Sequence, residues 1–319
     1  MPPPREQQLL VKAARLYYEE GRSQHQIADT LGVSRSSVSR MLTAARDRGI
    51  VQIRINDPAG RDLDLEGELA SRFGLRDCRV AENAAGERPL PRVGELGARW
   101  LLENLHSGQR IGVSWGRSVQ AVVQHVPEET ALDVEVLPLV GGLSSVESAI
   151  TGEELVRDLA ARLGGAFQRL HAPALLTSKA GRDILLAEPS IRDALERARK
   201  VHVAVIGIGN VGVGSSAALV DALELTPEER REFDGHQPVG DFCARYFDGE
   251  GRPVPGPVDE RVLSVSLADL ARIPTVAGVA AGTEKVRGTA GALRTGVLDV
   301  LICDQSLATA LLRGSHGKV

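Results

Sequence analysis

Residues 23–42 read SQHQIADTLGVSRSSVSRML, and this stretch decides the fold of the first part of the chain. Ser23 and Gln26 have the spacing of a capping box, in which the serine hydroxyl accepts from the third amide of a helix and the glutamine reaches back. Gly32 stands where a tight turn needs a positive φ, which costs glycine little. Ser34 then caps another helix. The spacing predicts two short helices joined by a turn, which is a helix-turn-helix.

The flanking residues extend this pattern. A preceding helix has apolar residues at helical spacing, and Gly21 ends it. Its expected buried face consists of Leu9, Leu10, Ala13, Leu16 and Tyr17. Residues 50–55 alternate in polarity, which predicts a short strand. The expected helix-turn-helix domain spans residues 1–56.

The last of these helices presents short hydroxyl side chains and arginines outward. Short side chains let a helix lie deep in the major groove, and arginine pairs with guanine edges or with phosphates. We expect Arg35, Ser36 and Ser39 to contact bases. We expect Arg40 and Arg46 to contact phosphates of double-stranded DNA. The candidate DNA-binding residues are Ser23, Gln24, Ser34, Arg35, Ser36, Ser37, Ser39, Arg40 and Arg46. The alternative is a helical hairpin with a solvated polar face.

Charge is unevenly distributed along the 319 residues, whose formal net charge is −4. Residues 1–57 hold nine Lys and Arg against six Asp and Glu, a net charge of +3, and the rest of the chain has −7. A basic first part has the sign expected of a DNA-binding domain. Aromatic residues make up only 3% of the chain, which argues against a stacking platform for single-stranded nucleic acid.

The cysteines and the N-terminus bear on the compartment. Cys78, Cys243 and Cys303 are far apart and odd in number, so we expect neither a disulfide framework nor a cysteine zinc site. The opening residues MPPPREQQ lack the apolar core of a signal peptide. No run approaches the roughly 20 apolar residues of a membrane span. We expect a cytoplasmic protein that binds no membrane, metal or cofactor.

From about residue 76 onward, apolar runs alternate with helical stretches. The strand-like runs are residues 111–115, 134–140, 201–208, 275–280 and 297–303. This rhythm predicts a Rossmann-like α/β domain over residues 76–319, with a mainly parallel sheet covered on both faces. Residues 57–75 are expected to form a linker and a helix at residues 63–73. In such sheets ligands bind outside the carboxyl ends of the strands, so the loops that follow strands hold the candidate site.

Residues 113–118, VSWGRS, form the first such loop. Gly116 allows close approach of the backbone, and Ser114 and Ser118 offer hydroxyls. Arg117 adds a positive charge, and the helix that follows offers free amides. Together these groups predict a phosphate cradle. A tight strand-to-helix turn with a serine cap is the alternative.

Two glycine loops follow later strand ends. Gly141 and Gly142 fit a turn and a ligand contact equally well. Residues 207–212, GIGNVG, match a dinucleotide fingerprint letter for letter. That fingerprint should open a helix at once, whereas here the next four residues prolong the loop. We interpret it as a loop in which Gly207 and Gly209 approach some ligand other than a nicotinamide.

Two charged residues complete the candidate site. Asp241 precedes a hairpin-like segment at residues 246–251, where an acid could bind sugar hydroxyls or cap a turn. Lys285 follows Glu284 at the start of a helix, after the run 275–280. A lysine there is unfavourable against the helix dipole unless an anion compensates, so Lys285 is a candidate phosphate partner. A solvated surface lysine is the alternative.

These motifs together resemble one family. The whole chain resembles the sorbitol-operon-type (SorC) transcription regulators, which include the deoxyribonucleoside and central-glycolytic-gene regulators. The resemblance rests on residues 23–42, 112–118, 171–173, 207–209, 284–285 and 298–304. It implies a domain with the fold of sugar-phosphate isomerases, deaminases and coenzyme A transferases. Such a domain senses a phosphorylated sugar or polyol and is not an enzyme. The resemblance also implies a homodimer or homotetramer on a DNA operator.

The resemblance assigns roles to the matched positions. Those near a ligand phosphate are Ser114, Gly116, Arg117, Ser118 and Lys285. Those on the sugar side are Gly141, Gly209 and Asp241. The candidate effector-binding set also includes Trp115, Gly142, Gly207 and Glu284. The chain departs from the family pattern at residues 281–283, AGT, where a Gly-Gly pair is usual, and at Asp241, where a longer Glu is common.

Two functions remain open. The first is a regulator in which a bound metabolite shifts the arrangement of paired DNA-binding heads. The alternative is a sugar-phosphate-processing enzyme with an appended DNA-binding head, which needs a general base such as Asp241 or Glu284. The sequence contains no HExxH, no GxSxG and no metal-spaced histidine pair. We therefore assign no catalytic residue, and we interpret His171 as structural.

Overall fold

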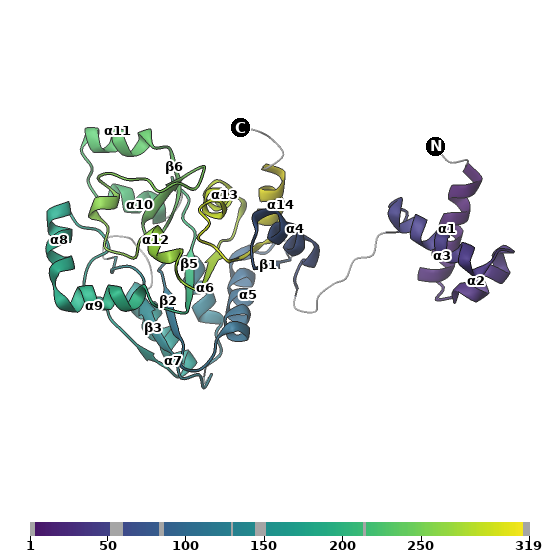
Figure 1. The fold of residues 1–319 in the computed structure, drawn as a ribbon, viewed down its shortest axis with the longest axis horizontal. Coiled ribbons are helices and arrows are strands. Elements are labelled where there is room, and N and C mark those ends of the chain that lie inside the picture. Colours follow the sequence, from purple (N-terminus) through teal and green to yellow (C-terminus); the bar gives the residue numbers. More distant parts are fainter. Residues whose placement is uncertain are drawn as a thin grey trace. The chain divides into compact units, whose positions relative to one another are not determined.

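The computed structural model describes residues 4–51, 60–82, 86–128, 130–143, 151–212 and 215–314. The chain divides into two compact units, Met1–Asn56 and Asp57–Val319, and each is described by itself (Figure 1). Within the described ranges, no helix combines the length and the apolar character that crossing a bilayer requires.

The first unit consists of three helices, α1 (Pro4–Tyr18), α2 (Gln24–Leu31) and α3 (Arg35–Asp47). Apolar side chains from all three meet in a small core, in which Ile27 and Val38 are fully buried. Because α1 packs on both α2 and α3, the two later helices are held in a fixed arrangement.

The predicted caps build the N-termini of α2 and α3 and the turn between these helices. The Ser23 hydroxyl accepts from the Gln26 amide at 3.3 Å, and the Gln26 side chain accepts from the Ser23 amide at 2.9 Å. Gly32 has the left-handed φ of 66°. The Ser34 hydroxyl accepts from the Ser37 amide at 3.2 Å. The predicted helix-turn-helix is confirmed.

Two details of this unit differ from expectation. Leu9 and Tyr17 are 38% and 37% exposed, although their spacing placed them on the buried face of α1. Leu10 is buried as predicted, and Ala14, which was not predicted, is buried beside it, because a small residue at position 14 allows α1 and α3 to approach on that side. Of the strand expected at residues 50–55, the first two residues lie in a bend after α3, and the others lie outside the described residues.

The second unit is built on a seven-stranded sheet in which every pairing is parallel. In spatial order its strands are β1 (Asp77–Ala81), β9 (Val300–Asp304), β8 (Thr275–Val279), β5 (Val203–Gly207), β2 (Arg110–Val113), β3 (Glu135–Pro138) and β4 (Ala166–Phe167). The predicted α/β domain with a parallel sheet is confirmed. The two edge strands, β1 and β4, are those that the apolar runs did not delimit.

Both faces of the sheet are buried. In β5, Val203 and Val205 point into one core, whereas Ala204 and Ile206 point into the other. Strands buried on both faces read as unbroken apolar runs, which is why their sequence shows no alternation. The helices on the face of Val203 are α5 (Pro89–Asn104), α6 (Arg117–His125) and α7 (Gly152–Leu163).

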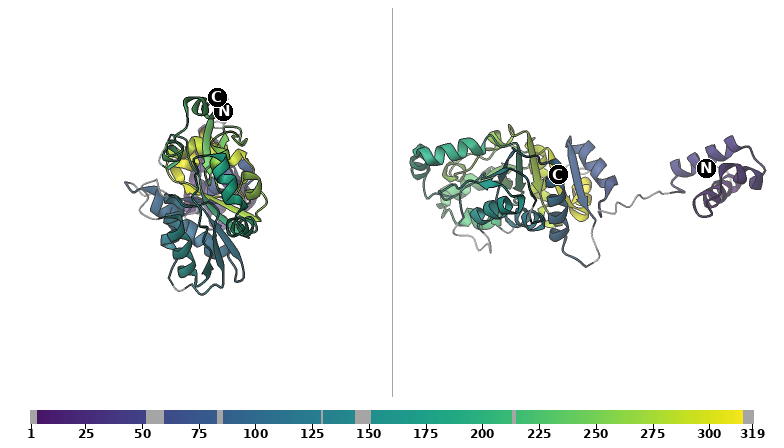
Figure 2. Two further views of the ribbon diagram at one scale, coloured as in Figure 1. Left: turned by 90° about the vertical axis from the view of Figure 1, so that its left-hand side faces the viewer. Right: turned by 90° about the horizontal axis from the view of Figure 1, so that it is seen from below.

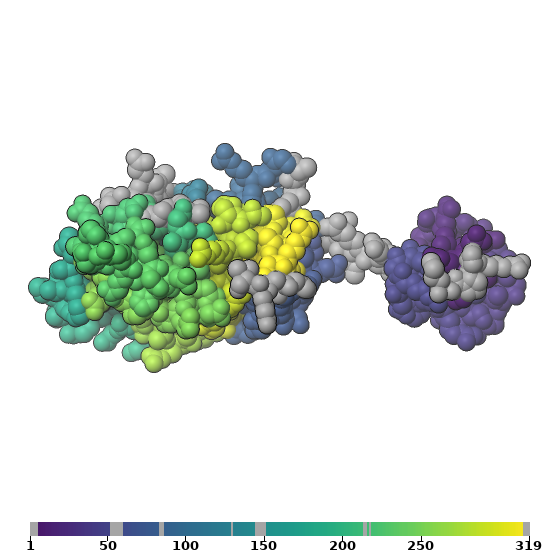
Figure 3. All heavy atoms as spheres, turned by 90° about the horizontal axis from the view of Figure 1, so that it is seen from above, coloured from purple at the N-terminus to yellow at the C-terminus, as the bar shows by residue number. Residues whose placement is uncertain are grey.

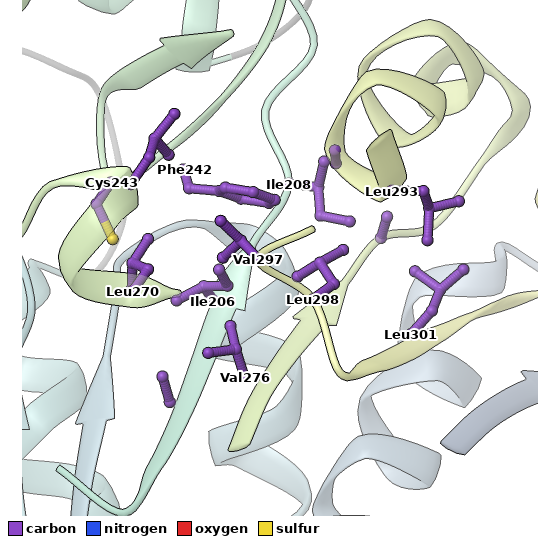
Figure 4. Packing of buried hydrophobic residues seen from close by; sticks show 14 of the residues in the cluster. Ile206, Ile208, Phe242, Cys243, Leu270, Val276, Leu293, Val297, Leu298 and Leu301 are labelled. Carbon is purple, nitrogen blue, oxygen red and sulfur yellow. The ribbon is translucent and has the colours of Figure 1, made fainter. Parts of the chain in front are cut away.

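The core on the face of Ile206 lies beneath helices and a hairpin. Its covering elements are α4 (Leu63–Phe73), α13 (Val286–Arg294), α14 (Gln305–Gly314), β6 (Pro238–Phe242) and β7 (Arg245–Asp248). Figure 4 shows Phe242 of the hairpin reaching over Val297 toward Ile208. The helix predicted at residues 63–73 is α4, and it packs against β1 and α14 (Figure 2).

The remaining helices lie between the strands of this unit. They are α8 (Lys179–Ala187), α9 (Pro189–Ala198), α10 (Ser215–Asp221), α11 (Pro227–Gly235), α12 (Leu267–Leu270) and the 3₁₀ turns η1 (Asp259–Arg261) and η2 (Thr283–Lys285).

The hairpin begins earlier than the sequence predicted. Its turn lies at Cys243 and Ala244, which have φ values of 52° and 62°, and not at residues 246–251. Neither residue is a glycine, so the sequence carries no turn signal there. Asp241 is thus a strand residue of β6, and the glycine-rich segment forms a second turn closed by Asp248.

The strand order places a crevice at the middle of the sheet. From β2 the chain proceeds through β3 to β4 at one edge, and from β5 it proceeds through β8 to β9 toward the other. The loops that follow β2 and β5 therefore diverge, which makes this position a topological switch point.

Candidate functional site

A cavity of about 370 Å³ lies at the switch point. Ten of the twelve residues nominated from the sequence line it, the exceptions being Gly141 and Gly142. The described lining also includes Arg88, Pro89, Leu90, Ile208, Ser216, Cys243, Ala281 and Gly282. Loops that follow β2, β5 and β8 thus meet around one space, as the reading of strand ends predicted.

Ser114 ties two of these loops together. Its hydroxyl accepts from the Gly207 amide at 3.0 Å and donates to the Trp115 carbonyl at 3.3 Å. The Trp115 indole donates to the Gly141 carbonyl at 3.1 Å. These bonds fix the backbone that leads into α6, so Ser114 and Trp115 shape the wall of the cavity.

The N-terminus of α6 opens onto the cavity. Gly116 is its N-cap with a φ of 118°, and no side chain accepts from the amides of the first turn. Free amides at a helix N-terminus favour an anion. Arg117 is exposed and forms no ion pair with any described residue. The Ser118 hydroxyl lies on the same turn, half-buried.

Lys285 faces this helix end from η2. Its ammonium group donates to the Ile208 carbonyl at 3.1 Å. Burial lowers the pKa of Lys285, the charge of Arg117 lowers it further, and the carboxylate of Asp241 opposes the shift. A half-buried ammonium with a second cation beside it does not fit a solvated surface lysine. A bound anion would compensate both charges.

Asp241 is 5% exposed and closes the hairpin turn. Its Oδ1 accepts from the Ser216 hydroxyl at 2.6 Å, and its Oδ2 accepts from the Ala244 amide at 3.1 Å. Burial raises the pKa of Asp241, while these hydrogen bonds and the charge of Lys285 oppose the rise. The turn-capping alternative therefore describes what this side chain does, and it also places a carboxyl group in the cavity wall.

Gly209 packs directly against that hydrogen-bonded pair. A Cβ at this position would lie 1.8 Å from Asp241 Oδ1 and 2.3 Å from Ser216 Oγ. The next residue, Asn210, accepts from the Gly288 amide at 2.7 Å and so binds the loop to α13. Close packing accounts for the fingerprint-like glycines, because the helix that a dinucleotide site requires starts only at Ser215.

Gly141 and Gly142 have a different role from the one expected. A Cβ on Gly141 would lie 2.6 Å from the carbonyl carbon of Pro173. The Gly142 amide donates to the Ala172 carbonyl at 2.9 Å. Gly141 lets two loops approach each other, whereas a Cβ on Gly142 would come no closer than 4.0 Å to the Ala172 carbonyl oxygen. Gly141 is connected to the cavity wall through its bond to Trp115. Ala172 and Pro173 thus pack against the loop after β3.

Two polar lining residues, Arg88 and Ser216, were not predicted from the sequence. Arg88 directly precedes α5, and the signal for it was Pro89 at the first position of that helix. Because β1 was not delimited, the loop that follows it was not recognised as a strand end. Ser216 becomes part of the site only through Asp241, which lies 25 residues further along the chain, and no local pattern reports that pairing.

The candidate DNA-binding residues surround the exposed side of α3. Its buried face consists of Val38, Leu42 and Ala45. Helical geometry places Ser36, Ser39 and Arg40 on the opposite face. Thr43 lies there too and is exposed, although the sequence analysis did not nominate it. The Ser34 hydroxyl, which caps the helix, is 2.9 Å from the hydroxyls of both Ser36 and Ser37.

Among the described arginines of this unit, those without an ion pair all lie on α3. Arg35, Arg40 and Arg46 are exposed and form no ion pair with a described residue. The other arginines pair with nearby carboxylates, in the pairs Arg15–Glu19, Arg22–Glu20 and Arg48–Glu6. An unpaired basic face on a capped helix is the electrostatic footprint of a DNA-reading element.

Comparisons with known proteins match both units of the chain. Residues 3–48 match the family described as "Sigma-70, region 4", and residues 57–313 match the one described as "Putative sugar-binding domain". The sorbitol operon regulator of Klebsiella pneumoniae is 32% identical over 309 residues, which are 96% of this chain and 98% of that protein. This chain belongs to the sorbitol operon regulator (SorC) family of transcription regulators.

Other relatives support the same assignment. The deoxyribonucleoside regulator of Bacillus subtilis strain 168 is 32% identical, covering 96% of this regulator and 97% of its own chain. The crystal structure of full-length SorC from Klebsiella pneumoniae matches with a TM-score of 0.73, at 32% identity and 96% and 98% coverage. The relatives are transcription regulators and not enzymes, and so is this chain. The enzyme alternative has no support.

Proposed function

We propose that this regulator binds a phosphorylated sugar or polyol in the cavity, and that binding changes its affinity for a DNA operator. The observation that carries the proposal is the convergence of Lys285, Arg117 and the uncapped N-terminus of α6 on one space. A phosphate supplies negative charge and acceptor oxygens, which can bind all three of these groups. A cavity of about 370 Å³ suits a small metabolite.

The proposed orientation of the sugar phosphate follows from the residues on each side of the cavity. The phosphate lies near Gly116, Ser118 and the two cations. The sugar lies toward Gly209 and Asp241, whose carboxylate oxygens each retain a lone pair for a hydroxyl donor. The shorter reach of an aspartate leaves more room there than a glutamate would.

On the DNA side, we propose that α3 enters the major groove. Arg35, Ser36 and Ser39 contact base edges, and Arg40 and Arg46 contact phosphates. Ser23 and Gln24, at the N-terminus of α2, approach the DNA backbone. Two copies in a homodimer or homotetramer would then occupy half-sites separated by whole helical turns. The regulator works in the cytoplasm, where such operators lie.

Substitution of Arg35 by alanine is expected to weaken binding to the preferred operator by about 1–3 kcal/mol and to relax base preference. The preferred sequence is first selected from random duplexes with the full chain, and affinity is then measured by fluorescence anisotropy at fixed salt. Arg15→Ala is the matched control, because Arg15 is an arginine of the same unit that is already paired with Glu19. Equal losses in the two variants would contradict the proposed orientation of α3.

The effector is tested by thermal stability against a panel of sugar phosphates and polyol phosphates, each beside its unphosphorylated form. A compound that binds only the folded state stabilises it by about 2.7 kcal/mol at 100 times its Kd. We expect phosphorylated compounds alone to raise the melting temperature of the second unit. If the free sugars raise it equally, the assignment of Arg117 and Lys285 to a phosphate is wrong.

A further inference from the structure

A buried carboxylate stands directly behind the cavity loop. Asp304, the last residue of β9, is fully buried. Its Oδ1 accepts from the amide of Gly282, a residue of the cavity lining, at 2.7 Å. Its Oδ2 accepts from the amides of Ser306 and Leu307 at 3.0 and 3.2 Å, and also from the Ser306 hydroxyl. One carboxylate thus joins the loop after β8 to the first turn of α14.

This arrangement makes the two elements mechanically dependent. A buried carboxylate that loses a donor is costly, because no water replaces the lost hydrogen bond. Asp304 must therefore follow the Gly282 amide when the loop shifts. Since the same side chain caps the N-terminus of α14, the start of that helix moves with it.

The next residue continues the connection. The Gln305 side-chain amide donates to Asp62 Oδ2 at 2.8 Å. The other oxygen of Asp62 accepts from the Leu65 amide at 3.2 Å, which caps the N-terminus of α4. The ends of α14 and α4 are therefore joined through two side chains. Figure 3 shows the yellow C-terminal residues bordering the blue residues of the α4 region, and α4 and α14 are in contact.

Asp62 also lies where the chain enters the second unit. Its amide donates to the Val80 carbonyl at 2.9 Å, and the Glu82 amide donates to the Gly60 carbonyl at 2.9 Å. Gly60 is the first described residue after the DNA-binding unit. The residues that receive the segment from that unit are thus held by β1 on one side and by Gln305 on the other.

We propose that Asp304, Gln305 and Asp62 form a relay that carries the state of the cavity to the segment leading to the DNA-binding unit. The proposal rests on the proposed function, because it takes Lys285 as a ligand of the effector. The Lys285 amide donates to the Gly282 carbonyl at 3.1 Å, so an anion that draws Lys285 inward also moves the residue bound to Asp304. The element that shifts in this proposal is the junction of α14 and α4, which Gln305 and Asp62 join.

The test is hydrogen exchange of the full chain, with inorganic phosphate as the probe. Gln305→Leu removes the donor to Asp62 and leaves the cavity lining intact. In the wild type, phosphate is expected to slow exchange both at residues 281–290 and at residues 60–73. In Gln305→Leu the first effect persists and the second disappears. Without phosphate, exchange in the first turn of α4 rises about fivefold, the factor for loss of one net hydrogen bond.

Thr309→Val is the matched control, since Thr309 donates only to the Gln305 carbonyl of its own helix, at 2.8 Å. It should behave as the wild type. Phosphate protection of residues 281–290 with no effect on residues 60–73 in the wild type overturns the relay and leaves the proposed phosphate site standing. If phosphate protects neither segment, the phosphate site is wrong. The relay is then tested by hydrogen exchange without phosphate. If exchange in α4 is the same in Asp304→Asn and Gln305→Leu as in the wild type, the relay is refuted.

Discussion

Lys285→Met is expected to lower the affinity for the stabilising sugar phosphate about 100-fold, which corresponds to roughly 2.7 kcal/mol. The reason is the loss of a charge-assisted hydrogen bond from a half-buried ammonium, whose own burial makes it a strong partner for an anion. Isothermal titration calorimetry on the full chain measures the change. The free energy of unfolding should fall little, because the ammonium makes only one hydrogen bond to the described part of the protein.

Arg287→Met is the matched control for this loss. Arg287 lies two residues further along on α13, is exposed, and forms no ion pair with any described residue. The Arg287→Met substitution removes the same net charge from the same region as Lys285→Met. A general electrostatic effect would therefore lower the affinity for the sugar phosphate in both variants. A 100-fold loss confined to Lys285→Met supports direct contact with the phosphate, and equal losses contradict it.

Gly209→Ala is expected to destabilise the second unit by about 3 kcal/mol. The added methyl group would overlap Asp241 Oδ1 and Ser216 Oγ, which are joined by a buried hydrogen bond. Overpacking costs about 1–3 kcal/mol, and displacing a buried charged acceptor adds to that cost. Urea denaturation followed by tryptophan fluorescence measures the second unit alone, because both tryptophans, Trp100 and Trp115, belong to it.

Gly235→Ala provides the comparison for that variant. Gly235 ends α11, and a Cβ there would meet no heavy atom within 4 Å. Its substitution should change the unfolding free energy by no more than about 0.5 kcal/mol, with a small gain from the reduced entropy of the unfolded chain. Equal stability of the two variants would show that the loop at Gly209 yields more easily than its packing indicates.

The first unit was predictable from sequence because its determinants are local. The bonds between Ser23 and Gln26, the φ of Gly32 and the cap at Ser34 each depend on residues within four positions of one another. One misplaced feature, the buried face of α1, depends on which helix packs against it. Tertiary packing decides which side of α1 is buried, and helical spacing alone predicts the buried positions only to within a residue or so.

The residues that line the cavity were predictable where the ends of the strands could be located in the sequence. Loops such as Ser114–Ser118 and Glu284–Lys285 were identified because parallel strands place their carboxyl ends at one edge. The turn at Cys243 was missed because positive φ at non-glycine residues leaves no signal. Gly141 was assigned to the ligand because a glycine that admits another loop and a glycine that admits a ligand look alike in sequence.

The positions of the two units and of the cavity residues along the chain have a consequence for synthesis on the ribosome. The described core of the first unit uses residues 10–51, so it is complete early in translation. The cavity proposed for the effector needs loops from Arg88 to Lys285, and it cannot assemble until nearly the whole chain has emerged. A product of premature termination before Lys285 would carry a DNA-reading helix and no working sensor. Nonsense mutations late in the gene should therefore give constitutive occupancy of the operator or dominant interference with it, and not a simple null phenotype.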